Sequence, residues 1–243
     1  MYSTVDQSSK ASRPFLTWQR VIDWANSHYR TRTFIKDERI PVRPGLLYLV
    51  YGGGVRLSGL TQLHVAETAT TKRSLAAQAA DESQQSEQEE AFLGFVGSGE
   101  PFEVVVQEPY TLQAYAHVEQ TTVAWLYWQD LESWPHFRRE VSEAFRYQNQ
   151  RKLLLLSALG QRRTIDRLLG FLTLVVREYG QPCEQGHKLP WALTHAQIAS
   201  AIGATRVTVT RLVGSLRQQG LLHITSDHLI VIPDLVEAER LAT

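Results

Sequence analysis

The stretch that decides the fold is ATRVTVTRLVGSLRQQGLL, from Ala204 to Leu222. Its front alternates apolar and polar residues like a strand, but over the whole stretch the apolar residues recur every three to four positions, as in a helix. These apolar positions are Val209, Leu212, Val213 and Leu216. The opposite face carries arginines and threonines and no acidic residue. The stretch therefore predicts an amphipathic helix, capped by Thr205, whose polar face suits an anionic partner.

A second short helix is predicted directly upstream, in LTHAQIASAIG. Thr194 is a favourable N-cap, Gln197 three residues later completes a capping box, and Gly203 ends the helix. Two short helices joined by a glycine-containing turn are typical of a helix-turn-helix. The following GLLHITSDHLIVIP, residues 220–233, is predicted to form the hairpin wing of a winged helix.

The polar face of the second helix has the side chains that read double-stranded DNA. Arginines reach guanine edges and phosphates, and threonines reach phosphates or thymine methyl groups. The alternative is an ordinary solvated basic helix. The cap, the turn and the arginine positions together favour DNA binding. The predicted DNA-binding residues are Thr194, Arg206, Val207, Thr208, Thr210, Arg211 and Arg217.

The rest of the chain predicts an α+β organisation. Glycine-separated β-prone runs between residues 40 and 126 indicate a small antiparallel barrel or sandwich, interrupted by a polar surface loop that is acidic over 81–90. A long helix follows and is a candidate for dimerisation; in the alternative it covers the barrel as a core helix. The next helix is expected to end at Gly180 in a glycine C-cap. The predicted parts are a disordered tail 1–14, an effector-sensing β-barrel domain 15–130, a dimerisation helix 131–160 and a winged helix-turn-helix domain 161–243.

Composition limits the class of protein. Residues 1–150 hold 14 Lys and Arg against 18 Asp and Glu, whereas residues 151–243 hold 11 against 7, so the basic excess lies in the predicted DNA-binding part. There is no membrane-spanning apolar run and no signal-peptide pattern. The single cysteine, Cys183, allows no intramolecular disulfide or iron–sulfur cluster, and we expect a cytoplasmic protein without a metal.

The helix-turn-helix sequence closely resembles that of the Crp/Fnr superfamily of bacterial transcription regulators, and TRVTVTRL is most similar to the cyanobacterial nitrogen-control branch. The resemblance implies a cyclic-nucleotide-binding-type barrel, a homodimer and base-reading positions at Arg206, Val207 and Arg211. Family members of the cAMP-receptor type have a glutamate where this chain has Val207. Because valine cannot accept a hydrogen bond from cytosine and contacts only a thymine methyl group, we expect palindromic half-sites of a GTA rather than a GTG type.

The effector pocket departs from the family pattern. Where cAMP-binding members have a Gly-Glu-Leu turn, this chain reads SGEPFEVV, and the phosphate-binding Arg-Ser pair is replaced by Tyr110 and Thr111. Without that arginine a cyclic phosphate loses its strongest single contact, so cAMP is not expected to bind there. His28, His64 and His117 form no recognisable set of haem ligands.

A charged cluster between the first helix and the barrel predicts another effector. Arginine reads the O6/N7 edge of guanine, a carboxylate reads N1/N2, and further arginines hold phosphates. Arg20-x-x-Asp23 with Arg30-x-Arg32 is similar to signatures of cyclic di-GMP receptors. A solvated ion-pair network is the alternative, and 2-oxoglutarate is a third candidate effector, suggested by the nitrogen-control likeness. The predicted effector-binding residues are Arg20, Asp23, Arg30, Arg32, Asp37, Arg39 and Arg43.

These features predict an effector-responsive DNA-binding regulator that acts as a homodimer, with RNA polymerase or another regulator as a candidate partner. The rival hypothesis is a nucleotide-binding signalling adaptor that works through protein–protein contact. An enzyme is not expected, because no nucleophile, metal or phosphate-loop constellation is present in the sequence.

Overall fold

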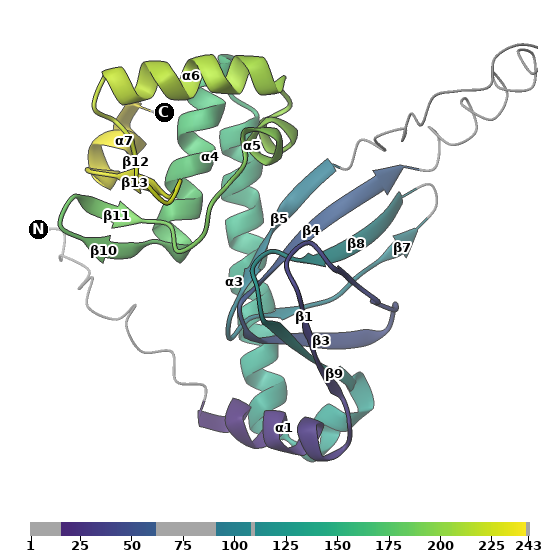
Figure 1. Ribbon diagram of the computed structural model, residues 1–243. Helices are drawn as coiled ribbons and strands as arrows, with labels where there is room; N and C mark the ends of the chain where they lie inside the picture. The colour runs from purple at the N-terminus through teal and green to yellow at the C-terminus, as the bar shows by residue number, and fades with distance from the viewer. Residues whose placement is uncertain (1–15, 62–90, 108–109, 242–243) are drawn as a thin grey trace, which may run out of the picture.

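The computed structural model describes residues 16–61, 91–107 and 110–241. The expected tail 1–14 and the acidic loop 81–90 lie outside these ranges. Figure 1 shows two bodies joined by a long helix: an N-terminal body of strands with a helix at its base, and a C-terminal body built mostly of helices.

Two antiparallel sheets form the N-terminal body, as the short β-prone runs predict. One sheet has the strand order β1-β9-β3-β6; the other has the order β2-β8-β4-β5, with β7 paired to β8. The strands are β1 (Thr31–Phe34), β2 (Arg39–Ile40), β3 (Leu46–Gly52), β4 (Gly54–Thr61), β5 (Ala91–Gly97), β6 (Pro101–Phe102), β7 (Val106–Gln107), β8 (Tyr110–Ala116) and β9 (Thr121–Tyr127).

The two sheets enclose one apolar core. Side chains from both sheets meet there, including Phe34, Val55, Phe102 and Val123, all of them buried. The alternation of inward apolar residues along each strand supplies this core. The expected barrel-type domain is therefore present as two sheets around a shared interior.

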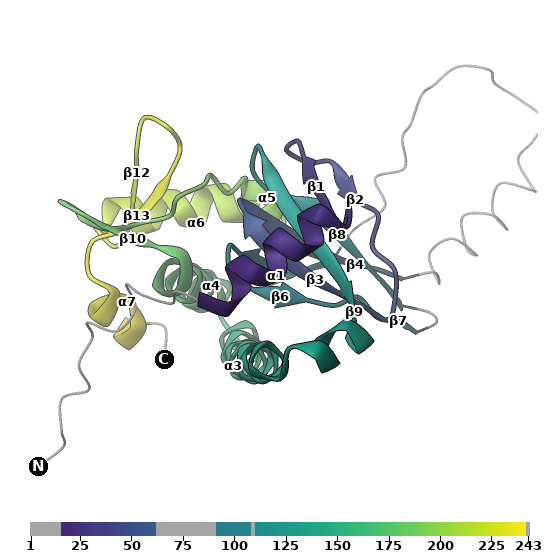
Figure 2. The same cartoon turned by 90° about the horizontal axis from the view of Figure 1, so that it is seen from below.

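Helix α1 (Leu16–Ser27) covers the outer face of the β3/β9 pair. Its Val21, Ile22 and Ala25 are buried against strand residues such as Leu47 and Leu126. Figure 2, seen from below, shows α1 lying across this sheet while α3 is viewed nearly end-on beside it. The N-terminal helix therefore belongs to the body of strands.

Helix α3 (Pro135–Leu159) follows the 3₁₀ turn η2 (Trp128–Ser133) and packs against both bodies. At its start, Phe137 and Val141 are buried in the same cluster as α1. Near its end, Leu155 and Leu159 pack against the core of the C-terminal body. The contacts of Phe137 and Val141 fit the interpretation of a core helix that covers the barrel, whereas Leu155 and Leu159 face the C-terminal body and other leucines of the last turns are exposed.

The C-terminal body contains a helix-turn-helix and a hairpin wing, as predicted. Its small sheet has the order β10-β11-β13-β12. The elements are α4 (Thr164–Tyr179), β10 (Gln181–Cys183), β11 (Gly186–Lys188), α5 (His195–Ile202), α6 (Arg206–Gln218), β12 (His223–Ile224), β13 (Ile230–Ile232) and α7 (Leu235–Leu241).

The cap at the end of α4 differs from the expectation. The helix ends at Tyr179, but Gly180 has φ −66° and ψ 143°, an extended conformation and not the left-handed one of a glycine C-cap. A Cβ at Gly180 would lie 2.2 Å from the carbonyl oxygen of Val176. Gly180 does cap the helix, since its amide donates to that carbonyl oxygen at 2.7 Å, but glycine is needed for this close backbone approach and not for a left-handed conformation.

Candidate nucleic-acid interface and interdomain junction

The helix-turn-helix is held by the local hydrogen bonds that the sequence predicts. The Thr194 side chain accepts from the Gln197 amide at 3.1 Å, and the Gln197 side chain accepts from the Thr194 amide at 3.0 Å. Gly203 has φ +62°, the left-handed conformation that glycine adopts without strain. Thr205 then caps α6 by accepting from the Thr208 amide at 3.2 Å. These bonds fix the start of each helix, and Gly203 makes the turn between them.

Helix α6 presents its polar face to solvent. Val209, Val213 and Leu216 are buried, so the opposite side faces outward. Val207 is 79% exposed, which is unusual for valine and leaves its methyl groups free to contact a partner. Of the predicted DNA-binding residues, Thr194, Arg206, Val207, Thr210, Arg211 and Arg217 are exposed, and Thr208 is half-buried.

Like Thr194, the other two predicted threonines already have internal partners. The Thr208 hydroxyl lies 2.9 Å from that of Thr205. The Thr210 hydroxyl donates to the carbonyl oxygen of Arg206 at 2.9 Å and lies 2.8 Å from Nδ1 of His195 on α5. His195 was not among the residues predicted from sequence.

The predicted effector cluster is spread over several local contacts. Arg30 forms an ion pair with Asp130 and lies over the rings of Trp24 and Tyr127. Arg32 pairs with Glu38 at 2.6 Å. These two contacts match the ion-pair alternative.

The remaining members of that cluster are exposed. Asp37 lies 3.9 Å from Arg56, and Asp23 accepts a hydrogen bond from Gln19 at 2.8 Å. Arg20 lies on α1, Arg39 on β2 and Arg43 just before β3. The sequence contains a second Arg-x-x-Asp, Arg163 to Asp166, and these two side chains form an ion pair at 3.8 Å.

A cavity of about 420 Å³ lies between the body of strands and helices α3 and α4. None of the seven predicted effector-binding residues lines it. Its walls are mainly apolar, with polar groups of α3 at one side. They include Phe92, Phe95, Phe102, Leu112, Phe145, Leu154, Gln148 and Arg151. A cavity of this size and lining suits a small, largely apolar ligand.

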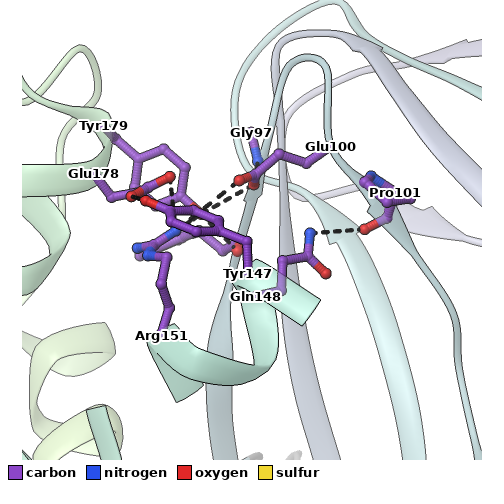
Figure 3. A network of polar contacts seen from close by, with 9 residues as sticks. Gly97, Glu100, Pro101, Tyr147, Gln148, Arg151, Glu178 and Tyr179 are labelled. Atoms are coloured by element: carbon purple, nitrogen blue, oxygen red, sulfur yellow. Dashed lines mark hydrogen bonds and ion pairs between the residues drawn. The ribbon is translucent and has the colours of Figure 1, made fainter. Parts of the chain in front are cut away.

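A buried polar network joins strands, α3 and α4 beside this cavity (Figure 3). Arg151 of α3 pairs with Glu178 of α4 at 3.0 Å and lies 4.0 Å from Glu100, in the turn after β5. The hydroxyl of Tyr147 donates to Glu178 at 2.7 Å. The hydroxyl of Tyr179 donates to the carbonyl oxygen of Phe95 at 2.8 Å. The network therefore ties the C-terminal body to the strands.

Burial governs the protonation of this network. Desolvation is the largest cause that raises the pKa of the Glu100 carboxyl, although the Gly97 amide donates to it at 2.7 Å. Burial likewise raises the pKa of the Tyr179 hydroxyl, and the nearby Glu100 charge adds to that effect. Sequence reasoning missed these residues because they come together only in the fold, with no local spacing to mark them.

Helix α5 also contacts the strands directly. The backbone amide of Phe92 on β5 donates to the Ser200 hydroxyl at 3.1 Å. Trp191, just before α5, has its ring 5.9 Å from that of Phe95 and 5.8 Å from that of His117. The helix-turn-helix thus contacts β5, beside the buried polar network that joins α3, α4 and the strands.

Neither a metal site nor a membrane helix is found in the part of the chain that the structure describes. No group of three His, Cys, Asp or Glu side chains there could hold a metal ion. Among the same residues, no helix is both long and apolar enough to cross a bilayer.

Comparison with known proteins identifies the C-terminal body. Residues 163–240 match the Crp-like helix-turn-helix domain. The global nitrogen regulator of Nostoc sp. is 40% identical over 78 residues, which cover 32% of this chain and 35% of that protein. Regulatory protein CysR of Synechococcus elongatus is 33% identical over 127 residues, or 51% of this chain and 56% of that protein. The chain therefore spans about a third to a half of the length of these relatives.

Solved structures extend the likeness to the whole fold. A CooA mutant from Carboxydothermus hydrogenoformans superposes with a TM-score of 0.62 at 21% identity, over 88% of each chain. A CRP-family transcriptional regulator from Thermus thermophilus gives a TM-score of 0.58 at 20% identity, over 87% of this chain and 96% of that one. Residues 163–240 therefore form a Crp-like helix-turn-helix domain, and the chain as a whole shares its fold with these structures.

Proposed function

We propose that the protein is a cytoplasmic transcription regulator that binds double-stranded DNA through α6, and that it is not an enzyme. The observation that carries this proposal is the outward face of α6, where Arg206 and Arg211 flank an exposed Val207 and no acidic side chain opposes a phosphate. Helix α6 is capped by Thr205 and contacts α5 through the His195–Thr210 pair, which supports this face as the one that enters a major groove.

A homodimer is the proposed DNA-binding form. Leu153, Leu154 and Leu156 in the last turns of α3 are 60%, 56% and 64% exposed, which is costly for three neighbouring leucines in water. Pairing two α3 helices would cover them and would relate two α6 helices by a two-fold axis. The target would then be a palindrome with half-sites about one helical turn apart.

Fluorescence anisotropy with a palindromic GTA-type duplex tests the proposal. We expect the affinity to fall steeply with added salt, because binding releases counterions from phosphates. Arg206→Ala should cost about 1–3 kcal/mol of binding free energy. Arg139→Ala, on the exposed side of α3, is the matched control and should change nothing.

The same assay tests the base that Val207 reads. Val207→Glu introduces a carboxylate that accepts a hydrogen bond from cytosine, so we expect preference to move from GTA-type toward GTG-type half-sites. If the wild type binds weakly and Arg206→Ala changes nothing, the signalling-adaptor hypothesis becomes the better one, with RNA polymerase or another regulator as the partner to seek.

We propose cyclic di-GMP as the effector, with 2-oxoglutarate as the second candidate. Support for the first comes from the arginines of the N-terminal cluster, although Arg30 and Arg32 already hold carboxylates. A ligand there would have to displace these pairs. Calorimetric titration of the wild type and of Arg30→Ala/Arg32→Ala decides: binding that is lost in the double variant supports the cluster as the site.

The cavity between β5 and α3 provides the control for that titration. Leu93→Trp would narrow the cavity without touching the N-terminal cluster. Binding that is lost in Leu93→Trp but kept in Arg30→Ala/Arg32→Ala would place the effector site in the cavity instead.

A further inference from the structure

His195 links the two helices of the helix-turn-helix. It is the first residue of α5, and its ring nitrogen Nδ1 lies 2.8 Å from the hydroxyl oxygen of Thr210 in α6. The same hydroxyl donates to the carbonyl oxygen of Arg206, one turn earlier, at 2.9 Å. Thr210 thus occupies the middle of the DNA-reading face and is held by both helices.

Counting protons fixes the tautomer of His195. A threonine hydroxyl has one proton, and that of Thr210 is given to Arg206. In the contact with His195 the hydroxyl oxygen can only accept, so Nδ1 must carry a proton and donate. In the neutral imidazole the other nitrogen, Nε2, is then without a proton and is itself an acceptor.

This tautomer matters beside DNA. Phosphodiester oxygens are acceptors only, so a neutral His195 with a bare Nε2 cannot bond to them. The imidazolium form has a proton on both nitrogens: it can keep the bond to Thr210 and donate from Nε2 to a phosphate.

We infer that His195 is a positioning residue of the DNA-binding surface whose Nε2 contacts a backbone phosphate, so that DNA binding takes up a proton at this side chain. The inference rests on the proposed DNA-binding function and adds to it. Nδ1–H orients Thr210 and the first turns of α6, while Nε2–H supplies the contact.

Other charged or titratable side chains of the C-terminal body lie on the wing and on α6. His228 of the wing lines the same groove of about 320 Å³ as His195 and Thr194. Arg206 and Arg211 of α6 precede and follow Thr210, and α5 itself has no other charged residue. A bound phosphate favours the imidazolium form, so in this proposal the proton is coupled to DNA binding.

DNA affinity from about pH 8 to about pH 5.5, where imidazoles titrate, tests the inference. The wild-type affinity should rise as pH falls, with a limiting slope of about tenfold per pH unit for each histidine that takes up a proton. His195→Asn places an amide N–H near the position of Nδ1 but cannot titrate. It should bind like the wild type at high pH and show a flat profile. His228→Asn is the matched control and should keep the wild-type slope.

Two readouts would overturn the inference. One is that the DNA affinity of His195→Asn depends on pH as steeply as that of the wild type. The contradiction would be strongest if the pH dependence disappeared in His228→Asn instead. The other needs no DNA: the nitrogen chemical shifts of His195 in the free protein should show the Nδ1–H tautomer, and an Nε2–H tautomer contradicts the proposal. The proposed function is tested separately, by DNA affinity at high pH and its loss in Arg206→Ala. It stands even if His195 does not titrate.

Discussion

At the scale of single residues, the capping box of α5 gives a direct test of how the helix-turn-helix is held. Thr194→Ala removes the acceptor for the Gln197 amide, which then loses its partner at the start of the helix. We expect a loss of about 1 kcal/mol in the free energy of unfolding, measured by denaturant titration. Thr194→Ser keeps the acceptor and should restore most of the loss; an equal loss in both variants would contradict the capping role.

Residues with a local role were the ones that the sequence predicted well. Thr194, Gly203 and Thr205 act within a few positions of themselves, so their spacing alone carries the information. Arg30 and Asp130 are 100 positions apart, and Tyr179 and Phe95 are 84 apart. Such contacts depend on how whole elements pack. No pattern along the chain could have shown that Arg30 was already paired.

At the scale of elements, α3 shows why an apolar repeat of three to four residues fits both a core helix and a dimerisation helix. Its buried residues near the start pack on the strands, while Leu153 and Leu156 near the end are exposed. A three- to four-residue spacing is the same whether the partner is the chain's own core or a second copy. The spacing therefore predicted an apolar face without specifying what covers it, and only its first part is buried within the chain.

The exposed leucines of α3 make a prediction about assembly. Leu153→Asp/Leu156→Asp places two charges where the proposed partner helix would pack, and we expect the protein to sediment as a monomer with much weaker affinity for the palindromic duplex. Because both leucines are exposed, the circular dichroism spectrum should stay unchanged. Asn149→Asp, on the same helix, should leave the assembly intact. A monomeric wild type would contradict the assignment.

The junction of α3, α4 and the strands predicts a second effect. Tyr179→Phe removes the hydroxyl that donates to the Phe95 carbonyl, leaving that acceptor and Glu100 with fewer partners. We expect a loss of about 1–2 kcal/mol in the free energy of unfolding, together with faster proteolysis between α3 and α4 as the two bodies separate. Tyr29→Phe, at a position 91% exposed, is the control and should have no effect.

At the scale of the whole molecule, His117 lies where the two bodies meet. It is 2% exposed, its ring nitrogens have no hydrogen-bond partner among the described residues, and its neighbours include Phe95 of β5 and Trp191 before α5. Burial, with a smaller contribution from the charge of Arg56, lowers the pKa of His117 from 6.5 to about 4. The native contact therefore requires the neutral imidazole.

The sign of the pH dependence follows from this lowered pKa. Above pH 6.5 the side chain is neutral in both the native and the unfolded protein, and the stability from burying it is fully present. Between that value and about pH 4 the unfolded protein takes up a proton that the native one does not, so the free energy of unfolding falls, by a limit of roughly 3 kcal/mol.

Urea unfolding at a series of pH values should show this loss for the wild type. His117→Phe keeps an aromatic ring against Phe95 and Trp191 but cannot titrate, so its curve should lack this component. His117→Gln should lack it too, and distinguishes loss of titration from a change in packing. Since Trp191 belongs to the C-terminal body, we expect its fluorescence to report separation of the two bodies in the same pH range. An equal pH dependence in the wild type and both variants would show that His117 does not control their contact.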